Sequence, residues 1–183
     1  MFLKEIYVIT GGPGFGKSSL IESLASLDYY CSGEFARDII EDQTEIDGEI
    51  LPWKNPKLFQ QEVLKRRIAF FDSVESGTIA FADRGIPDQL AFAKHKGFVS
   101  PQILIESNAI YRYAPQVFIT PPWPDIYTTD HIRKETLEEA IQIHRRVIET
   151  YLELNYEIVD LPLLPVTQRV DFILQTIGIR KDT

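Results

Sequence analysis

A glycine-rich loop that joins an apolar segment to an amphipathic segment constrains this chain more than any other feature. The apolar residues at 6–9 predict a short buried strand, and the spacing of leucine and isoleucine over 18–27 predicts a helix. The loop between them fits the pattern G-x-x-x-x-G-K-[ST], in which Gly11, Gly16 and Lys17 hold defining positions. Because strand, loop and helix follow in this order, we expect a phosphate-binding loop rather than a turn with a solvated lysine.

Each part of this loop has a chemical task in binding a nucleoside triphosphate. Glycine allows positive φ angles, so backbone N–H groups can point at phosphate oxygens, and the helix that begins near Lys17 adds the positive end of its dipole. The pattern assigns the Lys17 ammonium to the β- and γ-phosphates and the Ser18 hydroxyl to Mg²⁺. We expect the nucleotide to contact Gly11, Gly12, Pro13, Gly14, Phe15, Gly16, Lys17, Ser18 and Ser19.

The rest of the chain alternates short apolar segments with helical patterns, which predicts an α/β fold with about five parallel strands covered by helices on both faces. The expected strands are 5–10, 28–32, 78–82, 116–120 and 156–161. The expected helices are 18–27, 34–41, 56–76 (ending at Gly77), 86–96, 101–113, 136–154 and 166–177, with a polar loop at 42–56. No internal repeat or linker interrupts the pattern, so we expect residues 1–183 to form one domain.

Composition argues against several other classes of protein. The formal net charge of −8 gives no reason to expect a nucleic-acid partner, and we interpret the basic clusters at 65–67 and 145–146 as solvated helix faces. The single cysteine, Cys31, cannot form an intramolecular disulfide and is expected to pack on a strand. The histidine spacing predicts no zinc site. No segment resembles a signal peptide or a membrane span, so we expect a cytoplasmic protein.

Two charged residues follow the apolar segment 78–82. In a parallel sheet, ligands lie beyond the carboxyl ends of the strands, so Asp83 and Arg84 should lie beside the phosphate loop if this strand neighbours the first. An acid at this point can hold Mg²⁺, and an arginine can bind a phosphate or clamp an acceptor. The alternative is that Asp83 and Arg84 pair with each other and cap the following turn.

A second charged pair, Glu34 and Arg37, follows the second expected strand. The spacing of three residues places both on one face of a helix. In one interpretation, Glu34 is a general base or binds the acceptor hydroxyl, and Arg37 binds a phosphate. In the other interpretation, the two residues form a surface ion pair.

The proline-rich run at 121–124 stops the fourth strand and is followed by Asp130 and Arg133. A segment here could close over the phosphates as a lid, with Arg133 stabilising charge in the transition state. The alternative is that these residues are first-turn charges of a solvated helix. Trp53 and Trp123 could stack on a base, although such tryptophans more often cover the edge of a core.

Four stretches together resemble a known family: the phosphate loop, Glu-Phe-Ala-Arg at 34–37, Asp-Arg-Gly-Ile-Pro-Asp at 83–88 and Asp-x-x-Arg-x-Glu-Thr at 130–136. They are similar to the predicted ATPases of the small AAA-labelled P-loop group. That group is classed with the kinase domain of bacterial nicotinamide riboside kinases and with an insect protein required for trafficking of a photoreceptor channel. The resemblance implies a kinase-like fold, with strand order 2-3-1-4-5 and a lid after the fourth strand.

These residues together predict the transfer of a phosphoryl group from ATP to a small-molecule acceptor. The acceptor would lie between Glu34, Asp83, Arg84 and the helices within 56–113. ATP is favoured over GTP because the chain has no convincing N-K-x-D motif for guanine. An alternative is a nucleotide switch that hydrolyses ATP or GTP slowly and acts on a protein or lipid partner.

Catalysis in this interpretation depends on positioning and on neutralising charge. Lys17, Mg²⁺ and Arg133 would neutralise the γ-phosphoryl group, and Glu34 or Asp83 would accept the hydroxyl proton. Helical acceptor and lid segments are expected at about 42–76 and 121–136 of the sequence.

Overall fold

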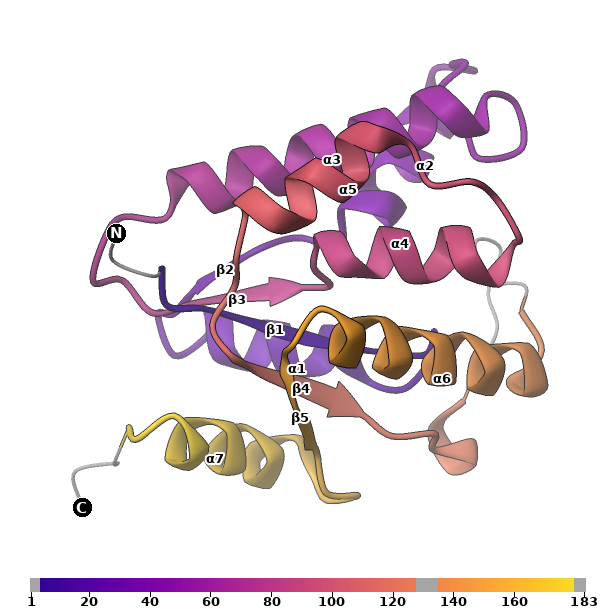
Figure 1. Cartoon of the computed structure of the whole chain (residues 1–183). Coiled ribbons are helices and arrows are strands. Elements are labelled where there is room, and N and C mark those ends of the chain that lie inside the picture. The colour runs from indigo at the N-terminus through magenta and orange to yellow at the C-terminus, as the bar shows by residue number, and fades with distance from the viewer. Residues whose placement is uncertain (1–3, 128–134, 180–183) are drawn as a thin grey trace.

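The computed structural model describes residues 4–127 and 135–179, and its centre is a five-stranded parallel sheet (Figure 1). The strands lie in the order β2-β3-β1-β4-β5, which confirms the predicted α/β class and the order 2-3-1-4-5 that the resemblance implied. They are β1 (Ile6–Gly11), β2 (Tyr30–Cys31), β3 (Ala80–Asp83), β4 (Gln116–Thr120) and β5 (Glu157–Asp160).

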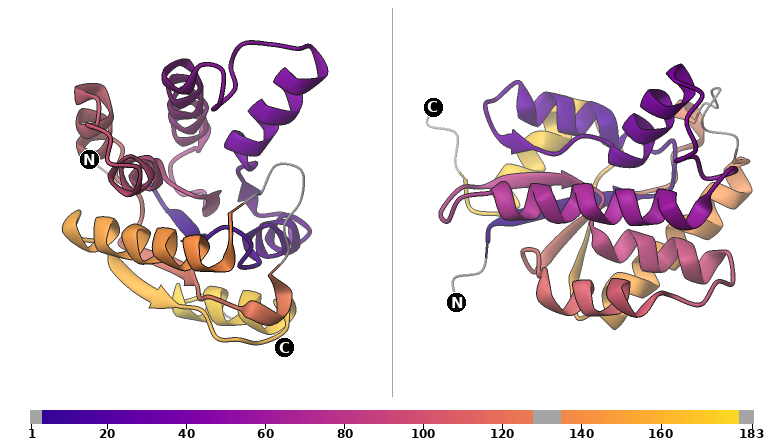
Figure 2. Two further views of the ribbon diagram at one scale, coloured as in Figure 1. Left: turned by 90° about the vertical axis from the view of Figure 1, so that its right-hand side faces the viewer. Right: turned by 90° about the horizontal axis from the view of Figure 1, so that it is seen from above.

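Helices cover both faces of the sheet (Figure 2). α1 and α7 pack together on one face, α4, α5 and α6 cover the other with α3, and α2 packs against α3. The helices are α1 (Lys17–Ala25), α2 (Phe35–Glu45), α3 (Pro56–Ser73), α4 (Ile86–His95), α5 (Gln102–Ile110), α6 (Leu137–Glu153) and α7 (Val166–Thr176), and a short 3-10 helix, η1 (Pro124–Ile126), follows β4.

Strand β1 illustrates why its segment of the sequence is continuously apolar. Val8 joins the cluster that contains Val147 of α6, whereas its neighbour Ile9 joins the cluster that contains Leu20 of α1 and Ile173 of α7. Successive side chains of a strand point to opposite faces, so a strand covered on both sides needs apolar residues at every position. Burying each such side chain contributes roughly 1.5–3 kcal/mol relative to exposure.

The helix α2 is longer than expected. It continues to Glu45 instead of ending at residue 41, so the polar loop begins later than the sequence indicated. The extra turn carries Asp42, whose Oδ2 lies 3.3 Å from Arg66 Nη2 of α3, and Thr44, whose hydroxyl donates to the carbonyl oxygen of Ile40 at 2.6 Å.

The helix α3 is shorter than expected and ends at Ser73. The next residue, Val74, has an extended backbone with φ −71° and ψ 120°, and its side chain is buried in the core. The expected helix end at Gly77 is therefore wrong. Gly77 instead takes a positive φ of 84° in the turn that leads to β3.

The buried carboxylate of Asp88 joins β1, the turn after β3 and α6. Its Oδ1 accepts hydrogen bonds from the Thr10 hydroxyl and from Arg84 Nη1 (2.9 Å). Its Oδ2 accepts from the Gly85 N–H (2.8 Å) and the Tyr151 hydroxyl (2.7 Å). Burial alone would raise the pKa of Asp88, but the charge of Arg84 and the bonds from Thr10 and Tyr151 help to hold this pKa below its usual value.

The turn before α4 has an unusual backbone that brings these donors together. Arg84 has a φ angle of 64°, in the left-handed region that non-glycine residues seldom adopt. The next residue is Gly85, where a Cβ atom would lie only 2.6 Å from the Tyr151 hydroxyl. The sequence Asp-Arg-Gly therefore encodes a turn that packs directly against α6.

Cys31 is a free thiol on β2 that packs against the core on the α1 side of the sheet. Burial raises the pKa of Cys31 to about 11, so the thiol stays protonated near neutral pH. This agrees with the expected packing role.

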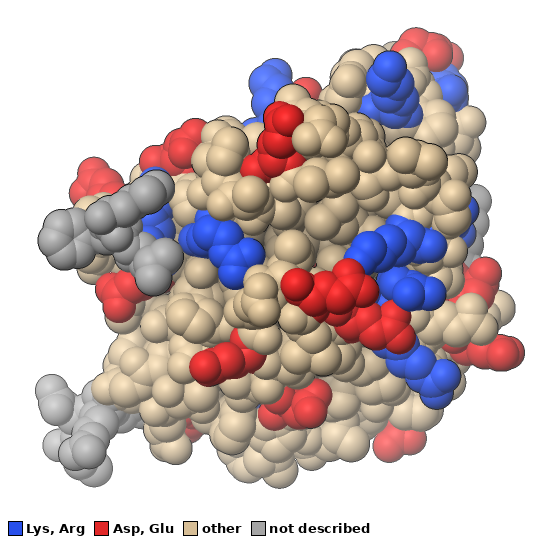
Figure 3. Space-filling view, in the orientation of Figure 1, with Lys and Arg blue, Asp and Glu red and all other residues tan. Residues whose placement is uncertain are grey.

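Acidic and basic side chains are interspersed on the face shown in Figure 3, with uncharged surface between them. Arg146 pairs with Glu149, and Arg66 pairs with Asp42 and Glu62, so these basic residues lie on mixed surfaces as expected. None of the described helices is both long enough and apolar enough to cross a lipid bilayer.

The contact between Tyr151 and Asp88 leads to a stability prediction. Tyr151→Phe should lower the free energy of unfolding by about 1–3 kcal/mol, because a buried carboxylate loses one of its donors. Tyr30→Phe is the control, since its partly exposed hydroxyl shares a hydrogen bond of 3.1 Å with Ser73 and water can replace that bond. Urea unfolding would measure both variants, and equal losses would show that the Asp88 contact contributes little.

Candidate active site

The loop between β1 and α1 is held by its glycines and by Phe15. Gly14 and Gly16 have φ angles of 79° and 77°, which suit glycine. Gly12 has no room for a side chain, because a Cβ atom would lie 2.3 Å from the Phe15 ring. That ring is fully buried and packs edge-on against His144 of α6, with the ring centres 5.9 Å apart. Phe15 therefore anchors the loop to the body of the protein.

Lys17 and Asp83 bring two buried charged groups to this loop. The Lys17 side chain is 5% exposed, and its Nζ donates a hydrogen bond of 2.7 Å to the carbonyl oxygen of Gly12. Burial, followed by the charge of Arg84, lowers the pKa of Lys17 to about 7. Burial raises the pKa of Asp83 to about 6. A bound phosphate would favour the charged form of Lys17, and a bound cation would favour the charged form of Asp83.

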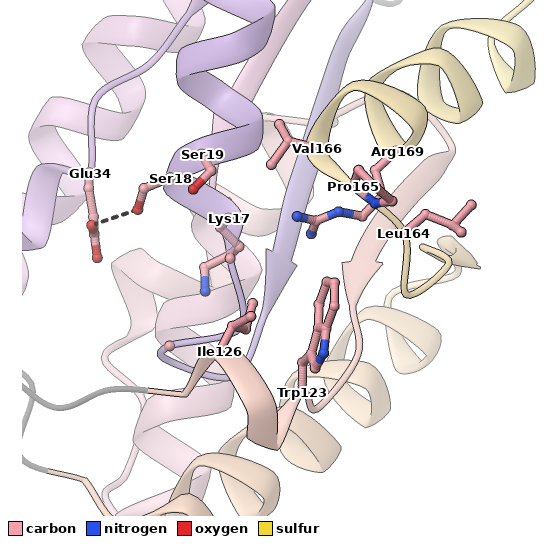
Figure 4. Close-up of a pocket in the computed structure, with 12 residues that line it drawn as sticks. Lys17, Ser18, Ser19, Glu34, Trp123, Ile126, Leu164, Pro165, Val166 and Arg169 are labelled. Atoms are coloured by element: carbon pink, nitrogen blue, oxygen red, sulfur yellow. Dashed lines mark hydrogen bonds between the residues drawn. The ribbon is translucent and has the colours of Figure 1, made fainter.

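The oxygens of Ser18, Glu34 and Asp83 are the groups that could hold Mg²⁺. Glu34 lies at the start of α2, with its Oε2 3.5 Å from Ser18 Oγ (Figure 4). Asp83 ends β3 opposite Ile9 of β1, and its buried Oδ1 has no hydrogen-bond partner among the described residues. Hydroxyl and carboxylate oxygens suit this ion, so Ser18 and Asp83 fit the role that the sequence predicts for them.

The described residues contain no cluster of three or more acidic, histidine or cysteine side chains that could hold a metal ion. Mg²⁺ is commonly bound by one or two carboxylates together with substrate phosphates and water. The set around Ser18 therefore suits an ion that arrives with a nucleotide rather than an ion held by the protein alone.

A cavity of about 420 Å³ lies against the start of α1, and we call it the α1 cavity. Residues that line it include Gly16, Ser18, Glu34, Trp123, Pro165 and Arg169. The guanidinium group of Arg169, from α7, lies 5.3 Å from the centre of the Trp123 ring. Figure 4 shows Lys17 and Ser18 on one side of this cavity and Arg169 and Trp123 on the other. The cavity thus combines a phosphate-binding loop with an aromatic and apolar wall, as a nucleotide requires.

A second cavity of about 340 Å³ lies between α2, α3 and α4, and we call it the α3 cavity. Residues that line it include Glu34, Trp53, Phe59, Arg67, Arg84 and Phe92. Much of the wall is apolar, and the polar groups include two buried arginines and a glutamate. Glu34 lines both cavities, so the two adjoin at this carboxylate.

The arginines that the sequence singled out have definite partners. Arg84 does not cap the turn through Asp83; its Nη1 donates to Asp88 and to the carbonyl oxygen of Gly11, each at 2.9 Å. Arg37 pairs with Glu41 one turn along α2 at 3.0 Å and also lines the α3 cavity.

The two tryptophans line different cavities: Trp53 lines the α3 cavity and Trp123 lines the α1 cavity. Asp130 and Arg133 lie outside the described residues.

Three residues of the site were missed by the sequence analysis: Asp88, Arg67 and Arg169. Arg67 belongs to the basic cluster at 65–67, and interpreting that cluster as a solvated face is wrong at this position, because Arg67 is only 5% exposed. The helical spacing could have found it, since residues 63, 67 and 70 share one face of α3 and Val63 and Phe70 are buried. Arg169 likewise shares a helix face with Ile173, which is buried, but its place beside the loop depends on the packing of α7.

A protein-family model described as an AAA domain matches residues 6–169, so the chain belongs to that family. No curated protein matches the chain significantly in sequence. The sequence comparisons thus identify the P-loop family without naming an activity.

Several solved structures have a similar fold. NadR protein in complex with NR has a TM-score of 0.65 and 16% identity, over 100% of this chain and 53% of that chain. Deoxyadenosine kinase from M. mycoides, with products dCMP and dCDP, has a TM-score of 0.64 and 15% identity, over 94% and 98% of the two chains. Thymidylate kinase from Ehrlichia chaffeensis has a TM-score of 0.61 and 11% identity, over 96% and 100%. This chain therefore has the fold of P-loop nucleoside and nucleotide kinases, and it spans about half the length of NadR.

The position of Lys17 leads to a binding prediction. Lys17→Ala should weaken the binding of ATP with Mg²⁺ by about ten- to hundredfold or more, because a charged donor to the phosphates is lost. The fold should persist. A lysine whose pKa falls on folding favours the unfolded state at pH 7, where the unfolded side chain is fully protonated, so its removal should not destabilise the free protein.

Calorimetric titration would measure this affinity, and thermal unfolding would report on the fold. The control is Lys57→Ala, which removes an exposed lysine in the first turn of α3. Unchanged nucleotide affinity in the folded Lys17 variant would contradict the assignment of this lysine to the phosphates.

Proposed function

We propose that this member of the AAA domain family is a kinase that uses ATP and Mg²⁺ to phosphorylate a small-molecule acceptor. The observation that carries the proposal is the position of Glu34, which lines both cavities. A nucleotide in the α1 cavity and an acceptor in the α3 cavity would bring the γ-phosphate and the accepting oxygen together beside a carboxylate. Positioning of this kind is a main source of catalysis in phosphoryl transfer.

The proteins of similar fold support this choice of chemistry. They include enzymes named deoxyadenosine kinase and thymidylate kinase, and NadR has been captured with NR and with NAD and AMP-PNP. At 16% identity or less these proteins share the fold, so we argue the activity from this chain's own residues.

In the proposed reaction, the hydroxyl oxygen of the acceptor attacks the γ-phosphorus of ATP. The bond between that phosphorus and the bridging oxygen breaks, ADP leaves, and the hydroxyl proton passes to Glu34 or Asp83. The loop backbone and Lys17 hold the phosphates, and Arg84 faces the acceptor from the α3 cavity. Mg²⁺, held by Ser18 and Asp83, would supply positive charge beside the β- and γ-phosphate oxygens.

Arg133 keeps its proposed role from the sequence, in which it neutralises charge on the transferred phosphoryl group. We also infer that residues 1–183 work as one domain, with acceptor and lid segments at about 42–76 and 121–136. In the first of these segments, the loop before α3 supplies Pro52 and Trp53 to the α3 cavity, and α3 itself supplies Phe59, Gln60, Val63 and Arg67.

The proposal predicts that a suitable acceptor accelerates ADP release. A panel of hydroxyl-bearing metabolites would be tested with ATP and Mg²⁺, and the active ones repeated with Glu34→Gln. This variant should lower acceptor-stimulated ADP release by about 10²–10⁴-fold, because the proton acceptor is lost, with little change in the affinity for ATP.

Glu45→Gln provides the control, since Glu45 is exposed at the end of α2 and lines neither cavity. If slow ADP release is insensitive to every compound but responds to a protein or lipid partner, the chain is a nucleotide switch. If an acceptor accelerates release equally in wild type and Glu34→Gln, the chain is a kinase in which Glu34 is not the base.

The proposed metal site makes a separate prediction. Asp83→Asn keeps the size of the side chain but removes a carboxylate, so the Mg²⁺ concentration for half-maximal nucleotide binding should rise about tenfold or more. Titration of Mg²⁺ against a fixed ATP concentration would measure it. The same magnesium dependence in the variant and in wild type would exclude Asp83 as a metal ligand.

A further inference from the structure

Arg67 is a buried cation that leaves part of its hydrogen-bonding capacity unused within the described structure. It projects from α3, lines the α3 cavity, and is 5% exposed. Its Nε and Nη1 atoms have no hydrogen-bond partner among the described residues. Arginine is rarely buried without a partner, because a guanidinium group removed from water loses strong hydrogen bonds. Packing alone therefore does not account for an arginine at this position.

The carboxylate whose charge acts most strongly on Arg67 is that of Asp88, and this carboxylate already accepts hydrogen bonds from other groups. Asp88 accepts hydrogen bonds from Thr10, Arg84, Gly85 and Tyr151, and its ion pair is with Arg84. The charge of Arg67 helps to lower the pKa of Asp88, but no hydrogen bond joins the two side chains in the described structure. The charge of Arg84 is compensated by Asp88, Asp83 and Glu34, whereas that of Arg67 is compensated mainly by Asp88, which is already bonded to other groups.

The unpartnered donors of Arg67 indicate what the cavity is built to receive. Arginine binds carboxylate and phosphate oxygens through several N–H donors, and such charge-assisted bonds are stronger in a buried setting. A neutral ligand would leave the charge of Arg67 unbalanced, whereas an anionic group would satisfy both its charge and its free donors. The apolar residues Phe59, Val63 and Phe92 around it suit the body of a small organic molecule.

We propose that the acceptor carries an anionic group, a phosphate or a carboxylate, in addition to the oxygen that receives the phosphoryl group, and that Arg67 binds this anionic group. The inference rests on the proposed function, because it assigns the α3 cavity to the acceptor. It adds the chemical class of the acceptor: we expect phosphorylated or carboxylated hydroxy compounds to bind in preference to their neutral counterparts.

Calorimetric titration with matched pairs of compounds tests the inference. The protein would first be saturated with Mg²⁺ and AMP-PNP, so that the phosphate loop is occupied and cannot bind the probes. The pairs are a nucleoside monophosphate and its nucleoside, ribose 5-phosphate and ribose, and glycerate and glycerol. Inorganic phosphate and acetate are included as minimal anions. The members of the first two pairs differ by a phosphate and those of the third by a carboxylate, so comparing the pairs shows which anionic group is preferred.

Arg67→Met should weaken the binding of the anionic member of a pair by about ten- to hundredfold and leave its neutral counterpart within about twofold. The free variant should be as stable as wild type or more stable, because an apolar side chain of similar length replaces an unpartnered buried charge. Lys65→Met, which removes an exposed cation from the same helix, should change neither property. Arg67→Lys, which keeps the charge without the planar fork, provides a second test if the methionine variant does not fold.

The inference is wrong if no anionic probe binds to wild type at millimolar concentration, if neutral and anionic partners bind equally, or if the Arg67 variants keep the wild-type preference. A large loss of stability in Arg67→Met with unchanged preference would show a structural role instead. ADP release separates this inference from the kinase proposal. An anion that binds through Arg67 without accelerating ADP release overturns the kinase alone. Neutral acceptors that accelerate ADP release in wild type as well as their anionic counterparts overturn this inference alone.

Discussion

The Asp88 carboxylate joins three parts of the fold at the carboxyl edge of the sheet, and both cavities depend on it. It accepts hydrogen bonds from β1, from the turn after β3 and from α6, and it holds Arg84 in a buried ion pair. Arg84 in turn donates to the carbonyl oxygen of Gly11, the first residue of the phosphate loop. Removing one partner of a buried ion pair typically costs about 3–5 kcal/mol, because the other charge is left uncompensated. The Thr10 hydroxyl, the Gly85 N–H and the Tyr151 hydroxyl hold Asp88 in place. Because Asp88 binds Arg84, these donors also help to position the phosphate loop on one side and the wall of the α3 cavity on the other.

Around this anchor, the site keeps polar groups that the free protein leaves unsatisfied. Asp83 Oδ1 has no hydrogen-bond partner, and Arg67 and Arg169 each have two nitrogens without partners among the described residues. A buried polar group without a partner costs about 1–3 kcal/mol, so these groups lower the stability of the free protein. Natural proteins keep such destabilising groups where function needs them, and a phosphate-bearing ligand would supply hydrogen-bond acceptors to the arginines.

The sequence predicted the sheet and the phosphate loop because both depend on local pattern. A buried parallel strand must be apolar throughout, and the loop needs glycine where φ is positive, as at Gly14 and Gly16. The order of the strands came from the family resemblance and not from periodicity. The sequence did not predict the burial of Arg67 or the approach of Arg169 to Trp123. The helical spacing marks the buried face of α3, but whether a basic residue on that face is buried depends on how the helix packs against other elements.

The net charge of −8 does not conflict with anion binding at the site, because the acidic residues and the cations of the site lie in different places. Acidic residues such as Glu41, Glu45 and Asp47 are exposed, whereas Lys17 and Arg67 are at least nine-tenths buried. Exposed charges are screened by salt over about 8–10 Å, whereas buried groups interact through a much lower effective dielectric constant. A phosphate inside either cavity therefore interacts mainly with the few cations in its walls. An acidic surface and a cationic interior can then coexist in one small fold, since the potential at the site is set by burial and not by the overall charge.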